Sequence, residues 1–523
     1  MTSQSGTPSI GRVDPVAPDG HLVLSIDQGT TNAKALLVDP LTGRTVARGS
    51  VPVGISFPAP GWVEQDPAEI WSATRRAIAA CLAERPGAVP IALAISNQRE
   101  SVVAWSRATG APLGPVLGWQ DARTAPECAR LGADGVADVV RSRTGLSLDA
   151  MYSAPKMRWL LEAAIGAGAA PDDICLGTVD SWLIWNLTGG ADFATEAGNA
   201  SRTLLFDLST LQWSTGLLDL FGIPGAALPE VRASDAGFGS TTEIGDLPAG
   251  VPIVAVLADS HAALYFHGCT EPGTGKATYG TGSSIMVPCD GPDTAPDGIA
   301  TTLAWLVGSP TYAREGNIIA AGSALDWMAG VLGVGPDRSG GAFLTDLAAD
   351  VHDTGGVHLV PAFSGLGAPY WDRDATGVLT GLTGGTTRAH LARAALEAVA
   401  HQVADVVEAI EADGRARVEV LHADGGATAS DLLMQIQSDL LGRPVNVADA
   451  SEASALGAAL LAARTLGLAP AARADERPSI NVRPTIDVEA RGARRAAWAE
   501  AVARSRGRAV PRASRTAASR DAG

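Results

Sequence analysis

The sequence predicts an α/β protein whose helices cover the faces of its sheets. Short apolar runs alternate with amphipathic segments along most of the 523 residues, as in layered α/β folds. Polar residues follow several of these runs directly, and the carboxyl ends of strands are where such folds bind ligands. A strand–turn–strand pattern at 22–38 returns at 276–287, which suggests two similar halves facing each other across a cleft.

The first half contains the clearer strand and helix signals. An N-terminal arm at 1–20 is rich in Ser, Gly and Pro and is predicted to be disordered. Asp66 is predicted to cap a helix that has Pro67 at its first position and Glu69 in its first turn. Asp180 is likewise predicted to cap a helix that Gly189 ends. The predicted strands are Leu22–Ile26, Ala35–Val38, Ile91–Ile95 and Ile253–Leu257.

The second half repeats the alternation. A short helix at Ser260–Phe266 follows Asp259, and a long one at Thr387–Ala412 ends at Gly414. Val418–Leu421 reads as a strand, followed by a helix that begins near Ser430 and ends at Gly442. Six arginines among small residues predict a disordered basic tail at 501–523.

Composition excludes several classes of protein. Hydrophobic residues make up 46% of the chain, which excludes a disordered protein, and the length allows several domains. The 39 Lys and Arg against 56 Asp and Glu give a net charge of −17, so no nucleic-acid partner is expected. The five cysteines have no CxxC spacing and are predicted to be free buried thiols. No secretory signal or long apolar run is found, so we expect a cytoplasmic protein without membrane insertion.

Three glycine-containing turns are candidate nucleotide contacts. Asp27–Thr31 (DQGTT) follows a buried strand, and its backbone amides and threonine hydroxyls could bind phosphate, with Asp27 holding the water shell of a Mg²⁺ ion. Tyr279–Gly282 (YGTG) is a second candidate phosphate turn. Asp424–Ala427 (DGGA) could admit a base or ribose. Taken alone, each turn is equally an ordinary structural turn.

Other polar residues could act on a hydroxylated substrate. Asp259 ends a strand and could accept a hydroxyl proton, although it could also be a helix cap. Arg99 and Glu100 form an adjacent donor and acceptor that suit vicinal hydroxyls, or a surface ion pair. Trp119 and Tyr152 could stack on a carbon backbone or fill a core. The GxxxxGK[ST] loop, protein-kinase motifs and an HExxH helix are absent.

In their order, these stretches resemble the FGGY carbohydrate kinases, and glycerol kinases in particular. The resemblance covers roughly residues 22–500 and rests on DQGTT at 27–31, PGWVEQD at 60–66, SNQRE at 96–100, GTVDSWLIWNL at 177–187, NASRTLLF at 199–206, TYGTG at 278–282, VPAFSGLGAPYWD at 360–372 and the segment 424–442. It implies the two-domain actin-like ATPase (ribonuclease H-like) fold with the active site in the interdomain cleft. The implied domains are 21–266, for polyol and the first phosphate loop, and 267–500, for nucleotide. The implied activity is transfer of the γ-phosphate of MgATP to a primary hydroxyl of a polyol.

The resemblance assigns roles residue by residue. Asp259 is the implied general base, and Asp27 is the implied magnesium contact, through water. The implied substrate contacts are Arg99, Glu100, Trp119, Met151, Tyr152, Asp259, Ser260 and Ser284. The implied ATP contacts are Thr30, Thr31, Asn32, Lys34, Thr281, Gly322, Asp326, Gly426 and Ser430.

Departures from the family pattern gather in the substrate pocket. Met151 replaces a tyrosine, Ser260 a glutamine and Ser284 a phenylalanine, which should enlarge the pocket. Glycerol is the first expected acceptor, and a longer polyol or a ketose such as erythritol, a pentitol, xylulose or ribulose is the alternative. The segment 245–250 lacks the expected arginine, so inhibition by a sugar bisphosphate is not expected. A homo-oligomer stays open, as does, more remotely, an actin-like ATP-binding module without sugar chemistry.

Overall fold

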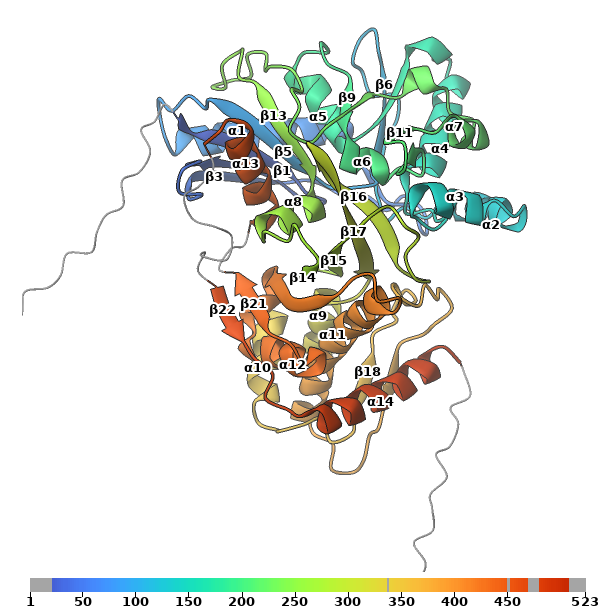
Figure 1. The fold of residues 1–523 in the computed structure, drawn as a ribbon, viewed down its shortest axis with the longest axis vertical. Helices are drawn as coiled ribbons and strands as arrows, with labels where there is room; N and C mark the ends of the chain where they lie inside the picture. The colour runs from blue at the N-terminus through green and yellow to red at the C-terminus, as the bar shows by residue number, and fades with distance from the viewer. Residues whose placement is uncertain (1–20, 336–337, 449–451, 469–478, 508–523) are drawn as a thin grey trace, which may run out of the picture.

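The first half of the molecule is built on a five-stranded sheet in the order β13-β5-β1-β2-β3 (Figure 1). The computed structural model describes residues 21–335, 338–448, 452–468 and 479–507. The strands are β1 (Val23–Gln28), β2 (Asn32–Val38), β3 (Thr45–Pro52), β5 (Ala92–Asn97) and β13 (Ile253–Ala258). Strands β1, β5 and β13 run parallel, whereas β1, β2 and β3 form an antiparallel meander. Every residue of β1 and β5 is buried, as expected for strands covered on both faces.

Helices cover both faces of this sheet. Helix α1 (Pro67–Ala83) and α5 (Val179–Leu187) share one apolar cluster with it, and α8 (Asp259–Phe266) and α13 (Ala453–Thr465) share another. Helix α1 begins as predicted, because the Asp66 carboxylate accepts a hydrogen bond from the Ala68 backbone N–H at 2.8 Å. Helix α13 comes late in the sequence but packs on the first sheet, next to α8 and β1.

A smaller four-stranded sheet, β4-β7-β6-β8, extends the first half. Its strands are β4 (Glu64–Gln65), β6 (Val102–Ser106), β7 (Val116–Leu117) and β8 (Ile174–Thr178), and α4 (Ser153–Gly166) packs on it. The prediction that Asp180 caps α5 was wrong. Thr178 is the N-cap residue, and Asp180 is buried in the first turn, where its carboxylate accepts hydrogen bonds from the Thr178 and Thr195 hydroxyls.

The second half is built on a seven-stranded sheet in the order β16-β17-β15-β14-β20-β21-β22. Its strands are β14 (Gly273–Tyr279), β15 (Ser283–Cys289), β16 (Ala300–Val307), β17 (Ser309–Ile318), β20 (Val418–Asp424), β21 (Val445–Ala448) and β22 (Ser479–Val482). The helices around it are α9 (Gly322–Val331), α10 (Gly340–Ala348), α11 (Arg388–Glu411), α12 (Asp431–Leu441) and α14 (Val488–Ser505). The predicted start of α12 near Ser430 is confirmed, and Thr387, expected as the first residue of α11, is its N-cap residue.

The repeat seen in the sequence is confirmed as two equivalent hairpins. Strands β1 and β2 pair antiparallel with β5 parallel beside them, and β14 and β15 pair antiparallel with β20 parallel beside them. One further cluster joins the halves: Met286 and Ala313 of the second sheet pack with residues of α8 and α13. The two sheets therefore meet at α13 and at α8, and α8 lies between the two halves in Figure 1.

Shorter elements complete the fold. They are α2 (Ala125–Ala133), α3 (Ala137–Thr144), α6 (Ala197–Ser201), α7 (Thr215–Phe221), β9 (Ala194–Glu196), β10 (Phe206–Asp207), β11 (Gln212–Trp213), β12 (Glu230–Arg232), β18 (His358–Val360) and β19 (Val378–Thr380). All five cysteines are free thiols, four of them buried and Cys289 partly exposed. Within the described residues, every helix is too short or too polar to cross a bilayer.

The chain ends differ in part from the prediction. Residues 501–505, placed in the disordered tail, continue helix α14, because Ala501 and Val502 are buried against the second half. The predicted arm at 1–20 and the remainder of the tail at 508–523 lie outside the described residues. The division of the chain at residue 266 stays a prediction.

Candidate active site

The carboxyl ends of three neighbouring parallel strands bring the first group of predicted residues together. In the register of the first sheet, Asp27 pairs with Ser96, and Asn97 pairs with Ala258, the residue before Asp259. Polar residues that follow β1, β5 and β13 therefore gather at one edge of the sheet, as the sequence suggested.

Asp259 lies at this edge and opens helix α8. It is the first helical residue and not the N-cap, which is Ala258. Its carboxylate accepts the Ser260 backbone N–H at 2.6 Å and lies 3.4 Å from the Arg99 Nε atom. The side chain is 34% exposed, so one oxygen can reach a bound ligand.

The surroundings of Asp259 tune it as a base. Burial raises the pKa of the Asp259 carboxyl to about 6, the nearby Arg99 opposes this rise, and the charges of Asp27 and Glu100 add to it. Asp259 is therefore mostly ionised at neutral pH, yet it is a stronger base than an ordinary aspartate.

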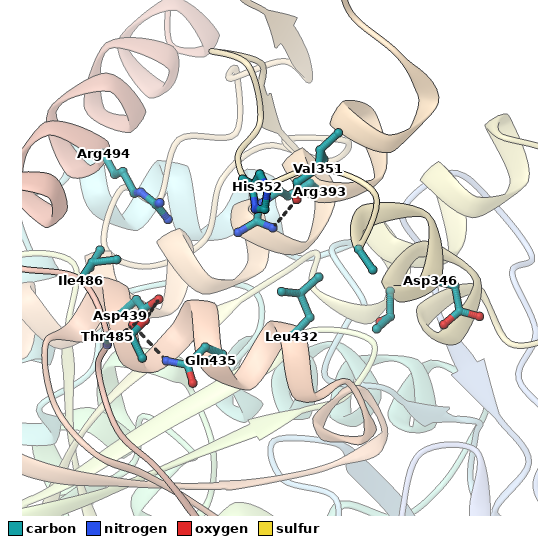
Figure 2. A pocket seen from close by; sticks show the side chains of 12 residues that line it. Asp346, Val351, His352, Arg393, Leu432, Gln435, Asp439, Thr485, Ile486 and Arg494 are labelled. Atoms are coloured by element: carbon teal, nitrogen blue, oxygen red, sulfur yellow. Dashed lines mark hydrogen bonds between the residues drawn. The ribbon is translucent and has the colours of Figure 1, made fainter.

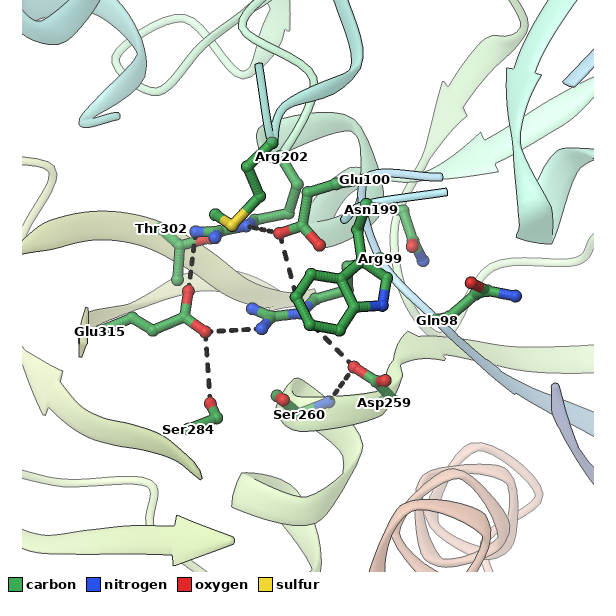
Figure 3. A network of polar contacts seen from close by, with 12 residues as sticks. Gln98, Arg99, Glu100, Asn199, Arg202, Asp259, Ser260, Ser284, Thr302 and Glu315 are labelled. Atoms are coloured by element: carbon green, nitrogen blue, oxygen red, sulfur yellow. Dashed lines mark hydrogen bonds and ion pairs between the residues drawn. The ribbon is translucent and has the colours of Figure 1, made fainter. Parts of the chain in front are cut away.

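Arg99 and Glu100 belong to a buried network of four charges (Figure 3). The Arg99 Nη2 atom lies 2.6 Å from Glu315, and Arg202 lies 2.8 Å from the other oxygen of Glu315. Arg202 also donates to Glu100 through Nε at 2.7 Å. Burial would raise the pKa of Glu315, but Arg202 and Arg99 outweigh it and hold that pKa well below its usual range. The network fixes the position of the Arg99 guanidinium, which lies closer to Glu315 than to Asp259.

Aromatic and sulfur side chains border this network. The Trp119 indole is 37% exposed, and its Nε1–H donates to the Thr30 hydroxyl at 3.0 Å. Met151 is partly buried, and its carbonyl accepts a hydrogen bond from the Lys156 ammonium. Tyr152 is buried behind it, with the Arg202 guanidinium over its ring, so it faces the core and not the cleft.

Ser260 and Ser284 lie on the other side of Asp259 and Arg99 and are both partly exposed. The Ser284 hydroxyl donates to Glu315 at 3.3 Å and lies 3.5 Å from the Lys276 ammonium. The hydroxyl groups of Ser260 and Ser284 therefore line this side of the site.

The first phosphate turn connects β1 to β2. The Gly29 N–H donates to the Asn32 carbonyl at 3.0 Å, and Asn32 in turn donates to the Thr31 hydroxyl. Asp27 is buried, and one of its carboxylate oxygens has no hydrogen-bond partner within the described part of the chain. Burial raises the pKa of Asp27, and Lys34, its register partner on β2, lowers it.

The predicted nucleotide contacts of the second half also gather at one place. The Gly322 N–H donates to the Gly280 carbonyl at 2.9 Å, beside Thr281, whose carbonyl accepts from Ser323. Gly425 has a φ of 95°, and a Cβ there would lie 2.6 Å from the Tyr279 carbonyl oxygen. The Tyr279–Gly282 turn, the backbone at Gly322 and the turn that contains Gly425 and Gly426 are therefore in close contact.

Two further predicted residues flank these turns. Asp326 is exposed on α9. Ser430 caps α12 by accepting the Leu433 N–H, and its hydroxyl lies 2.7 Å from that of Thr345. A separate cavity of about 470 Å³ lies behind them (Figure 2) and is lined by Thr345, Asp346, Ala349, Val351, His352, Arg393, Leu432, Gln435, Asp439, Thr485, Ile486 and Arg494. None of the predicted site residues lines this cavity.

Sequence reasoning missed four charged residues of the site. Glu315 and Lys276 lie in the middle of strands, Arg202 follows α6, and Lys156 on α4 donates to the carbonyls of Gly118 and Met151. Arg202 lies within the NASRTLLF stretch that carried the resemblance, although no role was assigned to it. For Glu315 and Lys276, the one available signal is a charged residue inside a run that otherwise reads as a buried strand.

Comparison with known proteins agrees with this geometry. The model of the FGGY family of carbohydrate kinases, N-terminal domain, matches residues 22–265, and that of the C-terminal domain matches residues 275–466. The chain is 44% identical to a glycerol kinase of Alkalilimnicola ehrlichii over 93% of this chain and 98% of that protein. It is 47% identical to an apulose kinase of Pectobacterium atrosepticum over 85% of this chain and 90% of that protein.

A solved structure shares the whole fold. The glycerol kinase of Plasmodium falciparum, crystallised with ADP, superimposes with a TM-score of 0.83 and 30% identity over 93% of this chain and 98% of that chain. The predicted actin-like ATPase fold is therefore confirmed. Matches to both family domains, full-length relatives and a shared fold lead to one conclusion: the chain belongs to the FGGY family and is an ATP-dependent carbohydrate kinase.

Proposed function

We propose that the enzyme transfers the γ-phosphoryl group of ATP to a primary hydroxyl of a small polyol, converting glycerol to glycerol 3-phosphate. The observation that carries the proposal is the position of Asp259. Its half-buried carboxylate lies beside the Arg99 guanidinium, at the strand edge that also carries the first phosphate turn. The glycerol kinases among the relatives support glycerol as the acceptor.

The acceptor is held on the Arg99 side of Asp259. Arg99 and Glu100 supply a donor and an acceptor for adjacent hydroxyls, and Trp119 offers an apolar face to the carbon chain. Met151, Ser260 and Ser284 form the remaining wall. Tyr152, being buried, acts by supporting Arg202.

ATP is held between the two hairpin turns. Backbone amides and hydroxyls near Thr30, Thr31 and Thr281 bind the phosphates. The adenosine lies against the second half, near Gly322, Gly426 and Ser430. Asn32 and Lys34 on β2 and Asp326 on α9 are the outer contacts of the same site.

A magnesium ion fits beside Asp27. The carboxylate is buried, and one oxygen finds no hydrogen-bond partner among the residues that the structure describes, which suits a contact with a metal-bound water. Mg²⁺ usually keeps several waters and takes its remaining ligands from carboxylates and substrate phosphates. Bound there, it would neutralise phosphate charge.

The residues of the chain then perform three tasks. Asp259 accepts the proton of the acceptor hydroxyl, and the hydroxyl oxygen forms a bond to the γ-phosphorus. At the same time, the bond from that phosphorus to the β,γ-bridging oxygen breaks, and ADP leaves. Arg99 keeps the hydroxyl aligned with Asp259. The turn amides stabilise charge on the transferred group, which is where most of the rate enhancement of such reactions originates.

A longer polyol or a ketose is the second candidate acceptor. Ser260 and Ser284 leave small, partly exposed hydroxyls at the pocket wall, where a further substrate hydroxyl could bind. The apulose kinase is as similar in sequence as the glycerol kinases are.

One experiment separates the candidates. ADP release is measured with MgATP against glycerol, erythritol, threitol, the pentitols, xylulose and ribulose. The proposal expects the highest kcat/KM with glycerol. A four- or five-carbon acceptor with the highest value would replace glycerol, and ADP release unaffected by every acceptor would contradict the polyol kinase. The oligomeric state and a cytoplasmic location stay predictions.

A further inference from the structure

Glu315 is a carboxylate of the second half that faces the first half. It lies on β17, and its side chain is fully buried. In the register of the sheet it pairs with Met286 on β15, which pairs with Lys276 on β14. Paired residues present their side chains on the same face of a sheet. Since Met286 packs against elements of the first half, Glu315 and Lys276 lie on that face too.

Glu315 contacts two arginines of the first half. One carboxylate oxygen lies 2.6 Å from Arg99 Nη2, and the other lies 2.8 Å from Arg202 Nη1 (Figure 3). Arg99 follows β5, and Arg202 follows α6. The carboxylate therefore bridges the two halves directly beneath the acceptor contacts.

Charge balance alone does not require Glu315. The two arginines already face two carboxylates of the first half: Arg202 lies 2.7 Å from Glu100, and Arg99 lies 3.9 Å from Glu100 and 3.4 Å from Asp259. What Glu315 adds is a competing partner for Arg99. Without it, the nearest carboxylate to Arg99 is Asp259, and a tighter pair would stabilise the ionised Asp259 carboxylate and weaken it as a base.

We propose that Glu315 is a positioning residue, which draws the Arg99 guanidinium away from Asp259 and holds it in the orientation that binds the acceptor. This inference rests on the proposed function of Asp259 and Arg99. Acceptor binding is thereby governed by a residue of the nucleotide-binding half.

The remaining contacts of Arg99 and Glu315 agree with this role. Arg99 Nη1 is buried and has no hydrogen-bond partner among the described residues, so one nitrogen is left for an acceptor hydroxyl while Nη2 is held by Glu315. Glu315 also has a contact within its own sheet, because the Ser284 hydroxyl donates a hydrogen bond to its carboxylate. The same hydroxyl lies within hydrogen-bond distance of the Lys276 ammonium.

Kinetics of Glu315→Gln test the proposal. The amide keeps the volume but loses the charge that holds Arg99, and a misplacement of about 1 Å can cost about 100-fold in rate. We expect kcat/KM for the acceptor to fall by about 10- to 100-fold, with the Kd of ADP unchanged within about twofold. Glu315→Asp keeps the charge and should restore part of the loss. Acceptor kcat and KM within twofold of wild type, or an equal loss of ADP affinity, would overturn the proposal.

Asp413→Asn is the matched control. Asp413 pairs at 2.5 Å with Arg314, the neighbour of Glu315 on β17, and its loss removes a strand ion pair away from the cleft. It should leave the acceptor kinetics unchanged. If Glu315→Gln does not fold, Glu315→Asp decides, because its carboxylate is set back by one methylene and should hold Arg99 less closely. A partial loss of kcat/KM for the acceptor is expected there, and a value within twofold of wild type counts against the proposal.

A crystal structure of the variant separates this inference from the proposed function. A wild-type enzyme that phosphorylates no acceptor of the panel contradicts the function alone. A Glu315→Gln structure in which Arg99 keeps its position relative to Asp259 contradicts the inference, whichever acceptor is used. The expected structure has the Arg99 guanidinium shifted toward Asp259.

Discussion

At the scale of single residues, the site is organised around the balance between Asp259 and Arg99. A cation 3.4 Å away would normally lower the pKa of a carboxyl, yet burial and two nearby carboxylates raise it to about 6. The result is a base that is ionised at neutral pH but strong enough to accept a proton. Sharing Arg99 with Glu315 contributes to this balance, since part of the guanidinium charge is engaged elsewhere.

Asp259→Asn should abolish most of the turnover. The amide keeps the size of the side chain but cannot accept the hydroxyl proton, so we expect kcat to fall by about 10²- to 10⁴-fold. ADP binding should be unchanged, because the residue lies on the acceptor side. Tyr265→Phe, a conservative change further along the same helix, is the control for local disturbance of α8. A variant at 259 that keeps near-full kcat would remove Asp259 from the mechanism.

The pH dependence follows from the same residue. A general base acts only when deprotonated, so with a pKa of about 6 the enzyme should be fully active above that pH. Below it, kcat/KM for the acceptor should fall about tenfold per pH unit. The profile is measured between pH 4.5 and 8.5, with samples returned to pH 7.5 to exclude irreversible unfolding. A flat profile down to pH 5 would contradict the assignment.

At the scale of secondary structure, helix caps and strand ends could be predicted from neighbouring residues, but contacts between residues far apart in the sequence could not. The caps at Asp66 and Ser430 depend on a few adjacent residues, and both are confirmed. The strand ends before Arg99 and Asp259 were also visible in the sequence. The partners of those residues were not, because Glu315 lies more than 200 positions from Arg99 in the chain and only the sheet register brings it there.

The error at this scale is the cap of α5. Asp180 is followed by a helical pattern, which favoured a cap, but threonine is also a preferred N-cap residue, and Thr178 occupies that position two residues earlier. Both side chains are buried, and the sequence pattern does not resolve which of them precedes the helix. Tyr152, for which the sequence left a pocket and a core interpretation open, is buried at the N-cap of α4.

The contact between β14 and the Gly425 turn gives a prediction at the scale of elements. Gly425 has a positive φ, and a Cβ there would lie 2.6 Å from the Tyr279 carbonyl oxygen, so Gly425→Ala must move the turn. We expect a loss of about 1–3 kcal/mol in stability and a raised KM for ATP. Gly426→Ala is the control for stability, since an added Cβ meets nothing within 4 Å there. Thermal unfolding and ATP kinetics check both. Equal melting temperatures for the two variants would contradict the argument.

At the scale of the whole molecule, the two halves are joined at the floor of the cleft and by α13. The Glu315 carboxylate pairs with Arg99 and Arg202 across the halves, and the Ser25 hydroxyl of β1 donates to the Ala455 carbonyl of α13. Breaking a buried ion pair on one side typically costs about 3–5 kcal/mol. These contacts should therefore persist when the outer parts of the two halves move. The region around Glu315 and α13 would then be the pivot of that movement.

This arrangement predicts closure when both substrates are bound. A kinase must keep water from the γ-phosphate, and closure of the halves around a fixed floor would do so. Asp259→Asn allows the test with MgATP itself, because it should bind both substrates without turning over. Small-angle scattering should show the radius of gyration, about 24 Å for a compact chain of this length, falling by roughly 1 Å with both ligands and less with either alone. Because the pivot includes Glu315, the same measurement on the double variant with Glu315→Gln should show a weaker response to the acceptor. A radius that stays constant under all conditions would mean that water is excluded by the static cleft, with no movement of the halves.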